Sequence, residues 1–458
     1  MVKALYARLA AIGRSAQFRS IGVLVSGTAV AHGITALAMP ISTRLYSPTD
    51  FAAATVFSSL VGLLVVASCL RFEMAIPLPA DDEEAVNLLA LSFGSIVATS
   101  AVAGIVLCFL PHAVLASFGQ PELVPYFWLL PLALFIGGLN LALQMWFVRR
   151  KGFGAIARSR VVQSTGAAGA QLGLGAAGIA PLGLLVGQML NYGAGAITLG
   201  LGLLMKERAL LSRISLSGMR SAARTHHRFP RYSIWEALAN SAAIHLPILL
   251  IAAVAPGPEA GFLALAIFLL QAPMALIGTS VGQVYLSGAP EALREGRLAV
   301  FTEDMMVRLI QLSAGPLLFA AIVSPTAFGL IFGHQWDRSG VLVAWMAPWF
   351  LMQFISSPVS TVLNVTGHQF TALVLQVSGL VLRVGVVLAA SVIQPTIVVE
   401  AYALSGFVFY FAYLVVAARA AGVHSPALAI RALSATPVIL ISLILAGVVY
   451  AILQLLPA

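Results

Sequence analysis

The chain has 458 residues, of which 60% are hydrophobic and only 9% are charged, and its mean hydropathy is +0.98. Soluble globular proteins carry about 25% charged residues, so this composition excludes a soluble protein and predicts a polytopic membrane protein. The net charge of +9 comes from basic residues scattered between apolar segments. That distribution argues against a nucleic-acid-binding surface and predicts basic loops at one membrane face.

The N-terminus combines a basic lead with an apolar run, and this combination has two interpretations. The basic residues are Lys3, Arg8, Arg14 and Arg19, and the run ends near Ala36-Leu37-Ala38. A signal peptide with a small-residue cleavage site has this order. The run is long for a signal peptide, however, and many further apolar segments follow it. We therefore expect an uncleaved first transmembrane helix.

Apolar segments long enough to span a membrane recur along the whole chain. A spanning helix needs about 20 apolar residues, and the segments lack the alternation of barrel strands. Thirteen spans are predicted, the last being an addition to a core of twelve: 20–42, 52–72, 85–110, 124–148, 154–178, 181–204, 232–255, 261–285, 306–332, 340–364, 369–393, 396–418 and 433–456. The expected fold class is thus an all-α polytopic membrane protein.

Basic residues collect in alternate connections between these spans. They follow the N-terminal lead in the connections around 149–160, 206–231, 294–308 and 419–431. The intervening connections near 111–122, 256–259 and 394–396 contain no Lys or Arg. By the positive-inside rule the N-terminus is predicted to be cytoplasmic. The acidic segment 81–84 is expected on the same side, where it caps the third helix.

A repeated pattern relates the two halves of the chain. Trp128 and Pro131 recur as Trp345 and Pro348, and Phe153 recurs as Phe370, each at an offset of 217 residues. A second match pairs Arg19 and His32 with Arg231 and His245. Similar offsets indicate a duplicated unit of six helices, and an even number of helices gives both copies the same orientation.

The repeat predicts a domain organisation. We expect an N-terminal six-helix lobe (1–204), a basic cytoplasmic linker (205–231), a C-terminal six-helix lobe (232–420) and an extra C-terminal transmembrane helix (421–458). Two such lobes around a central cavity are typical of transporters that work by alternating access. The linker holds seven of the 25 Lys and Arg residues and is expected to be a flexible tether. Gly169-x-x-x-Gly173 and Gly183-x-x-x-Gly187 predict close packing of the fifth and sixth helices.

Polar and charged residues within the spans are candidates for a substrate-binding cavity, because a charge in the membrane is costly. The deepest are Arg383, His32 and His245; nearer the cytoplasmic ends lie Arg71, Arg158, Arg160, Arg308 and Glu236. The mainly cationic set favours an anionic substrate such as a pyrophosphate. Other interpretations remain. The histidines could form interhelical hydrogen bonds, and the peripheral arginines could extend to the headgroups. Glu236 could pair with an arginine, or it could carry a proton or a cation.

Motifs of enzymes and metal sites do not account for the sequence. Gly278-Thr279-Ser280-Val281-Gly282 fits a nucleophile pattern, but it lies inside the predicted eighth helix, whereas the pattern requires a strand-turn-helix elbow. Cys69 and Cys108 are predicted near opposite membrane faces, so no disulfide and no metal site are expected. Neither a phosphate-binding loop nor a zinc motif is found. We therefore expect a protein that is not an enzyme and needs no cofactor.

Several segments resemble the Wzx-type polysaccharide flippases. The first helix and outer loop contain Ser26-Gly27-Thr28 and the run from Pro40 to Phe51, with Arg44 and Pro48 as motif residues. The run from Leu70 to Pro79, with Arg71 and Glu73, and the start of the sixth helix at Pro181 continue the resemblance. It covers most of residues 19–420. Ala52 replaces the glycine that usually follows the Asp-Phe pair.

The resemblance implies the fold of the multidrug/oligosaccharidyl-lipid/polysaccharide exporter superfamily. It also implies a flippase that moves polyprenyl-pyrophosphate-linked oligosaccharide across the bacterial inner membrane, for O-antigen, lipopolysaccharide or exopolysaccharide synthesis. Expected partners are the lipid-linked oligosaccharide, membrane lipids, and a polysaccharide polymerase and glycosyltransferases; nucleic acid is not among them. A multidrug–cation antiporter of the same fold is the main alternative, although it would need embedded carboxylates. A membrane glycosyl-transfer enzyme is a third.

Overall fold

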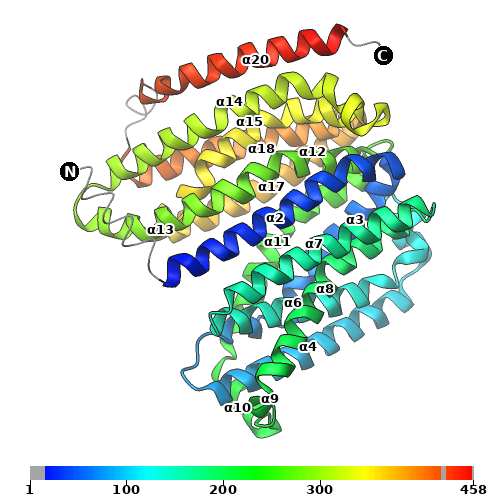
Figure 1. Ribbon diagram of the computed structural model, residues 1–458, viewed down its shortest axis with the longest axis vertical. Helices are drawn as coiled ribbons and strands as arrows, with labels where there is room; N and C mark the ends of the chain where they lie inside the picture. The colour runs from blue at the N-terminus through cyan, green and yellow to red at the C-terminus, as the bar shows by residue number, and fades with distance from the viewer. Residues whose placement is uncertain (1–15, 424–429, 456–458) are drawn as a thin grey trace. The chain divides into compact units, whose positions relative to one another are not determined.

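Helices make up the fold throughout the part of the chain that the structure describes. The structure is a computed structural model, and it describes residues 16–423 and 430–455 (Figure 1). The basic residues Lys3, Arg8 and Arg14, used above to orient the first helix, lie outside these ranges. Within them the regular elements are α-, 3-10 and π-helices.

The first compact unit comprises Met1–Tyr46 and Val56–His245. Its long helices are α2 (Ala16–Leu45), α3 (Pro48–Ser68, from Val56 onwards), α4 (Asp82–Phe109), α6 (Leu129–Arg149), α7 (Phe153–Ala176) and α8 (Leu182–Lys206). The short helices η1 (Phe72–Ala75), α5 (His112–Ala116), η2 (Pro121–Tyr126), α9 (Arg208–Leu211), α10 (Leu216–Thr225) and η3 (Phe229–Ser233) connect them, and the first half of α11 (Ile234–Val254) completes the unit.

The second compact unit comprises Ser47–Thr55 and Leu246–Ala458. After the second half of α11 it contains α12 (Glu259–Pro273), η4 (Met274–Gly278), α13 (Thr279–Arg294), α14 (Leu298–Phe332), η5 (His334–Trp336), α15 (Asp337–Val359), α16 (Val362–Val365), α17 (Gln369–Ile393), η6 (Pro395–Ile397), α18 (Val398–Ala420), η7 (Leu433–Ala435) and α20 (Thr436–Leu455). The predicted domain boundaries at 204, 231 and 420 remain predictions.

Each of the thirteen predicted spans coincides with a helical stretch. Several of them combine more than one element; the stretch at 261–285, for example, comprises α12, η4 and the start of α13. Ten helices of the described residues are long and apolar enough to cross a membrane. Helix α7 is not among them, because Arg158, Arg160 and several Gln, Ser and Gly residues lower its hydropathy. The protein is accordingly an all-α, multi-pass membrane protein.

Glycines of α8 produce the close packing that was predicted for the fifth and sixth helices. A Cβ atom on Gly183 would overlap the Leu174 side chain of α7 as well as the Tyr46 hydroxyl, and one on Gly187 would overlap the Gln171 side chain of α7. Small residues let helices approach closely in a membrane. On α7 itself, Gly169 and Gly173 face open space. The predicted approach therefore depends on the α8 glycines alone.

The basic linker is folded, in contrast to the flexible tether expected from its composition. Ser215 caps α10 by accepting a hydrogen bond from the backbone of Gly218 at 3.0 Å. Ala222 on the same helix is 2% exposed, and α10 packs against α4. Asn87 of α4 accepts from the Ser215 backbone at 3.0 Å and its amide fills the space beside Gly218. A buried apolar face and a side-chain cap are what make this short helix stable.

The helix order agrees with the repeat, although one matched motif is placed differently in the two copies. Phe153 and Phe370 both lie at the start of a helix, α7 and α17. Trp128 directly precedes α6, whereas Trp345 lies inside α15. The prolines of η2 explain this difference, because a proline cannot donate the backbone hydrogen bond that would continue a helix backwards through Pro125.

Candidate functional site

The eight candidate cavity residues are divided between the two units. Unit 1 holds six of them and unit 2 holds two: His32, Arg71, Arg158, Arg160, Glu236 and His245 in the first, Arg308 and Arg383 in the second. Within each unit their surroundings differ strongly.

Arg383 lies in an aromatic environment inside unit 2. It is near the middle of α17 and only 7% exposed. Its guanidinium lies 4.4 Å from the ring centroid of Phe409 and 5.5 Å from that of Tyr410, both on α18. Stacking on aromatic rings stabilises a desolvated guanidinium by about 2 kcal/mol. The rings therefore hold a permanent positive charge deep within an apolar helix pair.

Arg160 connects α7 to α2 in unit 1. Its guanidinium donates a hydrogen bond to the Thr28 hydroxyl. The two helices are close here because Gly27 leaves no room for a Cβ atom against Ala157. Arg158, one half-turn earlier, is exposed. The sequence Ser26-Gly27-Thr28, part of the family resemblance, thus provides both the close approach and a hydrogen-bond acceptor for a membrane-embedded arginine.

The two candidate histidines have different environments. His245 on α11 is half-buried, and its imidazole occupies the space left by the missing side chain of Gly62 on α3. Ser241, one turn earlier, donates a hydrogen bond to the Gly62 carbonyl at 2.8 Å. His32 on α2 is exposed. The structure shows no contact between these two histidines.

Arg71 and Glu73 form a buried ion pair in the turn between α3 and α4. Arg71 Nη1 lies 3.3 Å from Glu73 Oε1, and the carboxylate side chain is 3% exposed. Leu70 and Arg71 have φ angles of 49° and 64°, in the left-handed region that costs a residue with a side chain about 1–2 kcal/mol. Burial raises the pKa of the Glu73 carboxyl, and the Arg71 charge opposes that rise. Burial likewise raises the pKa of the neighbouring Cys69 thiol.

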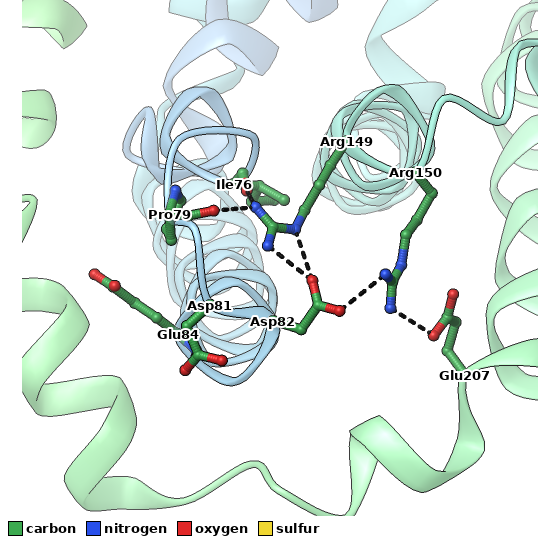
Figure 2. A network of polar contacts seen from close by, with 8 residues as sticks. All are labelled: Ile76, Pro79, Asp81, Asp82, Glu84, Arg149, Arg150 and Glu207. Carbon is green, nitrogen blue, oxygen red and sulfur yellow. Dashed lines mark hydrogen bonds and ion pairs between the residues drawn. The ribbon is translucent and has the colours of Figure 1, made fainter.

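A network of arginines and carboxylates joins the ends of α4, α6 and α8. Arg149 Nη2 lies 2.7 Å from Asp82 Oδ1, and Arg150 Nη1 lies 2.9 Å from Asp82 Oδ2. Arg150 also pairs with Glu207 at 2.8 Å. Figure 2 shows both guanidinium groups directed at the two oxygens of Asp82, with Glu207 beyond Arg150. The Asp82 carboxylate thus links the start of α4 to the end of α6, and Arg150 extends the network to Glu207 at the end of α8.

The Arg149 guanidinium also binds the backbone of the turn that precedes α4. It donates to the carbonyl oxygens of Pro79 and Ile76, the latter at 3.5 Å, and its side chain is only 10% exposed. This fixes the α3–α4 turn, which contains the Arg71–Glu73 pair. Sequence reasoning found the acidic 81–84 segment and the basic 149–151 segment separately. Both segments lie at helix ends on the same predicted membrane face, and this shared location could have predicted the ion pairs between them.

The acidic start of α4 also binds the linker. Asp81 is the N-cap of α4 and accepts from the Glu84 backbone at 3.4 Å, as predicted for this segment. Glu84 Oε1 lies 3.0 Å from His226 Nε2, and Glu83 lies 3.9 Å from Arg213. These three carboxylates therefore cap the helix and hold basic residues of the linker, an additional role that the sequence did not indicate.

Unit 2 contains a comparable cluster that sequence reasoning missed. Arg338, at the start of α15, pairs with Glu259 of α12 at 3.0 Å and with Glu400 of α18 at 2.6 Å. Both carboxylate side chains are less than one-sixth exposed. The cluster fixes the starts of three helices. A lone arginine between two distant glutamates has no local sequence pattern that would reveal it.

The remaining candidates lie at the surface of their units. Arg308 of α14 lines a groove beside α20, and Glu236 of α11 is exposed. Glu236 makes no ion pair with a residue that the structure describes, so the expected pairing is not observed. Of the motif residues, Arg44 is exposed near the end of α2 and Pro48 begins α3. The embedded groups are mainly cationic, an arrangement suited to binding an anion.

Three solved structures with the same fold are described as transporters or flippases. The lipid II flippase MurJ, in an inward closed conformation, matches with a TM-score of 0.69 at 11% identity over 95% of this chain and 98% of its own. An inward-facing multidrug resistance MATE family transporter of the MOP superfamily matches with a TM-score of 0.60 at 14% identity over 85% and 94%. A MOP superfamily transporter from Pyrococcus furiosus matches with a TM-score of 0.55 at 16% identity over 88% and 95%.

These similarities establish the fold, and a family model adds the sequence evidence. Among curated protein sequences, none is significantly similar to the chain. The model described as polysaccharide biosynthesis protein matches residues 41–341, which include most of unit 1 and the first helices of unit 2 through the start of α15. The chain therefore belongs to the polysaccharide biosynthesis protein family and has the fold of the MOP superfamily transporters.

Proposed function

We propose that the protein is a flippase for polyprenyl-pyrophosphate-linked oligosaccharide. It moves this lipid from the cytoplasmic to the periplasmic leaflet of the bacterial inner membrane by alternating access of its two lobes. Membership of the polysaccharide biosynthesis protein family is the observation that carries the proposal. The fold supports it, because one protein with the same fold is described as a lipid II flippase.

The charge of the embedded residues supports an anionic headgroup as the substrate. Arg383 keeps a guanidinium at the centre of α17, and Arg160 keeps one within α7. A guanidinium binds phosphate oxygens through two parallel hydrogen bonds. We assign Arg383, His32 and His245 to the substrate path, where they attract the pyrophosphate while the polyprenyl chain stays in lipid.

The biological setting follows from this assignment. The product would be an O-antigen, a lipopolysaccharide or another exopolysaccharide, and the partners a polymerase and glycosyltransferases. The N-terminus is placed in the cytoplasm, as the basic loops predict. The linker would then lie at the inner leaflet with its exposed arginines, Arg213, Arg220 and Arg224, near anionic headgroups.

A multidrug–cation antiporter is the second candidate, because a MATE family transporter shares the fold. Such a protein needs carboxylates that are available to a cation within the membrane. Asp50 in the first turn of α3 is engaged instead by the backbone and hydroxyl of Ser47, at 2.8 Å and 2.6 Å. Hypersensitivity of a deletion strain to cationic drugs, with surface polysaccharide intact, would favour the antiporter.

The test uses proteoliposomes with a fluorescent polyprenyl-pyrophosphate-linked oligosaccharide and a reductant that quenches the outer leaflet alone. The wild-type protein should make the inner-leaflet probe accessible, whereas protein-free vesicles should not. Arg383→Met retains the apolar contacts with Phe409 and Tyr410 but removes the charge, and Arg383→Lys retains the charge. We expect the methionine variant to lose at least about tenfold in rate, as the loss of a charge-assisted hydrogen bond implies.

A partial recovery with lysine would identify charge as the relevant property. The melting temperature of each variant in detergent separates a transport defect from misfolding. Wild-type protein that fails to move the probe, under conditions where it is folded and reconstituted, would refute the flippase. Normal transport by a folded methionine variant would refute the role of Arg383 and leave the family function standing.

A further inference from the structure

A polar groove lies between α14 and α20 in unit 2, and it contains none of the three residues assigned to the substrate path. The two helices run side by side (Figure 1). A cavity of about 550 Å³ opens between them where α20 begins. Its lining combines four residues of α14 with three that precede α20: Asp304, Val307, Arg308 and Gln311, with Ile430, Arg431 and Ser434.

The ion pairs at this groove leave one arginine available to a ligand. Asp304 and Arg308 are four residues apart on α14, a spacing at which an acid and a base commonly pair. Asp304 instead pairs with Arg431, which also lies 3.2 Å from Glu303. Arg308 makes no ion pair with any residue in the described ranges, and it is exposed. The Arg308 guanidinium is therefore not paired with a carboxylate of the described residues, in contrast to Arg431 on the other side of the groove.

Hydrogen bonds join the two walls of the groove. Gln311 Nε2 donates to Ser434 Oγ at 2.8 Å, and Ser434 Oγ donates to the Arg431 carbonyl at 2.6 Å. Further along, Gly315 of α14 leaves no room for a Cβ atom against Ser442 of α20. The two helices are thus held together on one side of the cavity, and the groove is a fixed feature of their packing.

The surface of α20 beside the groove is apolar and exposed. The most apolar stretch of the α20 segment has a mean hydropathy of 2.6, and only 6% of it is buried within the protein. Leu440, Ile441 and Ile444 are each more than half exposed. A helix with this surface faces acyl chains. A ligand of the groove would therefore meet a guanidinium at one end and apolar side chains along its length.

From this juxtaposition we propose that the groove binds a membrane phospholipid, with the headgroup phosphate at Arg308 and the acyl chains along α20. Phosphate is the anionic group that lies at the depth of an interfacial arginine, and a guanidinium matches its oxygens in pairs. The remaining N–H of the Gln311 amide is a second donor on the same wall. The proposed lipid site is separate from the residues assigned to the substrate path, so its test does not depend on the flippase assignment.

The experiment measures lipid binding to the full-length, delipidated protein in detergent by native mass spectrometry. Short-chain phosphatidylglycerol is the probe, and diacylglycerol of the same chain length is the control that lacks phosphate. Arg308→Gln removes the charge at an exposed position. Arg294→Gln is the matched control, since Arg294 is also exposed and ends α13 of the same unit.

We expect the wild-type protein to bind one phosphatidylglycerol molecule that diacylglycerol does not replace. Arg308→Gln should lower the affinity for phosphatidylglycerol at least about tenfold, whereas Arg294→Gln should leave it unchanged. Equal binding by wild type and Arg308→Gln would overturn the proposal, and so would equal binding of diacylglycerol. Displacement by inorganic phosphate at the probe concentration would show a site for free phosphate instead. Full displacement by equimolar undecaprenyl phosphate would assign the groove to the transported lipid and likewise overturn the proposal.

Discussion

The arginine pair at the end of α6 offers a matched test of how burial determines the strength of an ion pair. Arg149 and Arg150 are adjacent in sequence and bind the same carboxylate, Asp82, at 2.7 Å and 2.9 Å. Their side chains differ in exposure, at 10% and 32%. Replacing each with methionine retains most of the apolar stem and removes the guanidinium.

Arg149→Met should cost more stability than Arg150→Met. Arg149→Met deprives the Pro79 carbonyl of its donor, at about 1–3 kcal/mol, and weakens the contact at Ile76. With up to about 1 kcal/mol for the half-exposed ion pair, the total is about 2–4 kcal/mol. Arg150→Met removes two surface ion pairs, at about 0.2–1 kcal/mol each. It also removes a cation–π contact with the Trp146 ring at 5.3 Å, at about 0.5–1 kcal/mol, so its total is about 1–3 kcal/mol.

Thermal unfolding in detergent, followed by the loss of monodisperse protein, measures the difference. For a unit of 150–250 residues 1 kcal/mol corresponds to about 2–4 °C. Arg149→Met should therefore lower the melting temperature by roughly 4–16 °C, and Arg150→Met by less, roughly 2–12 °C. Arg149→Lys should behave like the methionine variant, because an ammonium cannot span Asp82 and the Pro79 carbonyl together. Equal losses for Arg149→Met and Arg150→Met would refute the reasoning from burial.

Two further predictions concern the turn after α3 and the glycines of α7 and α8. Burial raises the pKa of Glu73 in the folded protein, so the contribution of this carboxyl to stability is complete below its ordinary pKa of 4.5 and is lost as the pH rises through the raised pKa. Glu73→Gln should therefore flatten the dependence of the melting temperature on pH between about pH 4 and 8. An identical dependence for wild type and variant would contradict this prediction. Gly183→Ala should destabilise the protein by about 1–3 kcal/mol, because the added methyl group overlaps the Tyr46 hydroxyl. At Gly169 the added methyl group meets open space, so Gly169→Ala should leave stability unchanged or raise it by up to about 1 kcal/mol. Thermal unfolding measures both effects, and equal effects would be inconsistent with the packing.

Hydrophobic segments determine most of the fold without tertiary information. A lipid environment requires every backbone hydrogen bond to be satisfied within a segment, so a continuous apolar run of about 20 residues can only be a helix. For this reason all thirteen predicted spans agree with helices. The resemblance of the 70–79 and 181–188 segments to a known family was likewise legible from sequence, and the family match confirms it.

Polar contacts between helices were decided by the tertiary structure. Arg338 and its two glutamates are far apart in the chain, and only packing brings them within 3.0 Å. The linker shows the same dependence. Its composition predicted a solvated tether, but Asn87 and the buried Ala222 give it partners that no local pattern reveals.

The basic linker and Arg383 show which properties the sequence predicts and which depend on the tertiary structure. Charge and hydropathy alone identified the linker as a loop and Arg383 as an embedded cation, because both are properties of a segment. The linker's attachment to α4, and the stacking of Arg383 on Phe409, depend on which helices become neighbours. Those neighbours are determined by side-chain shape at close approaches such as Gly183 against Tyr46, information that exists only once the helices are packed.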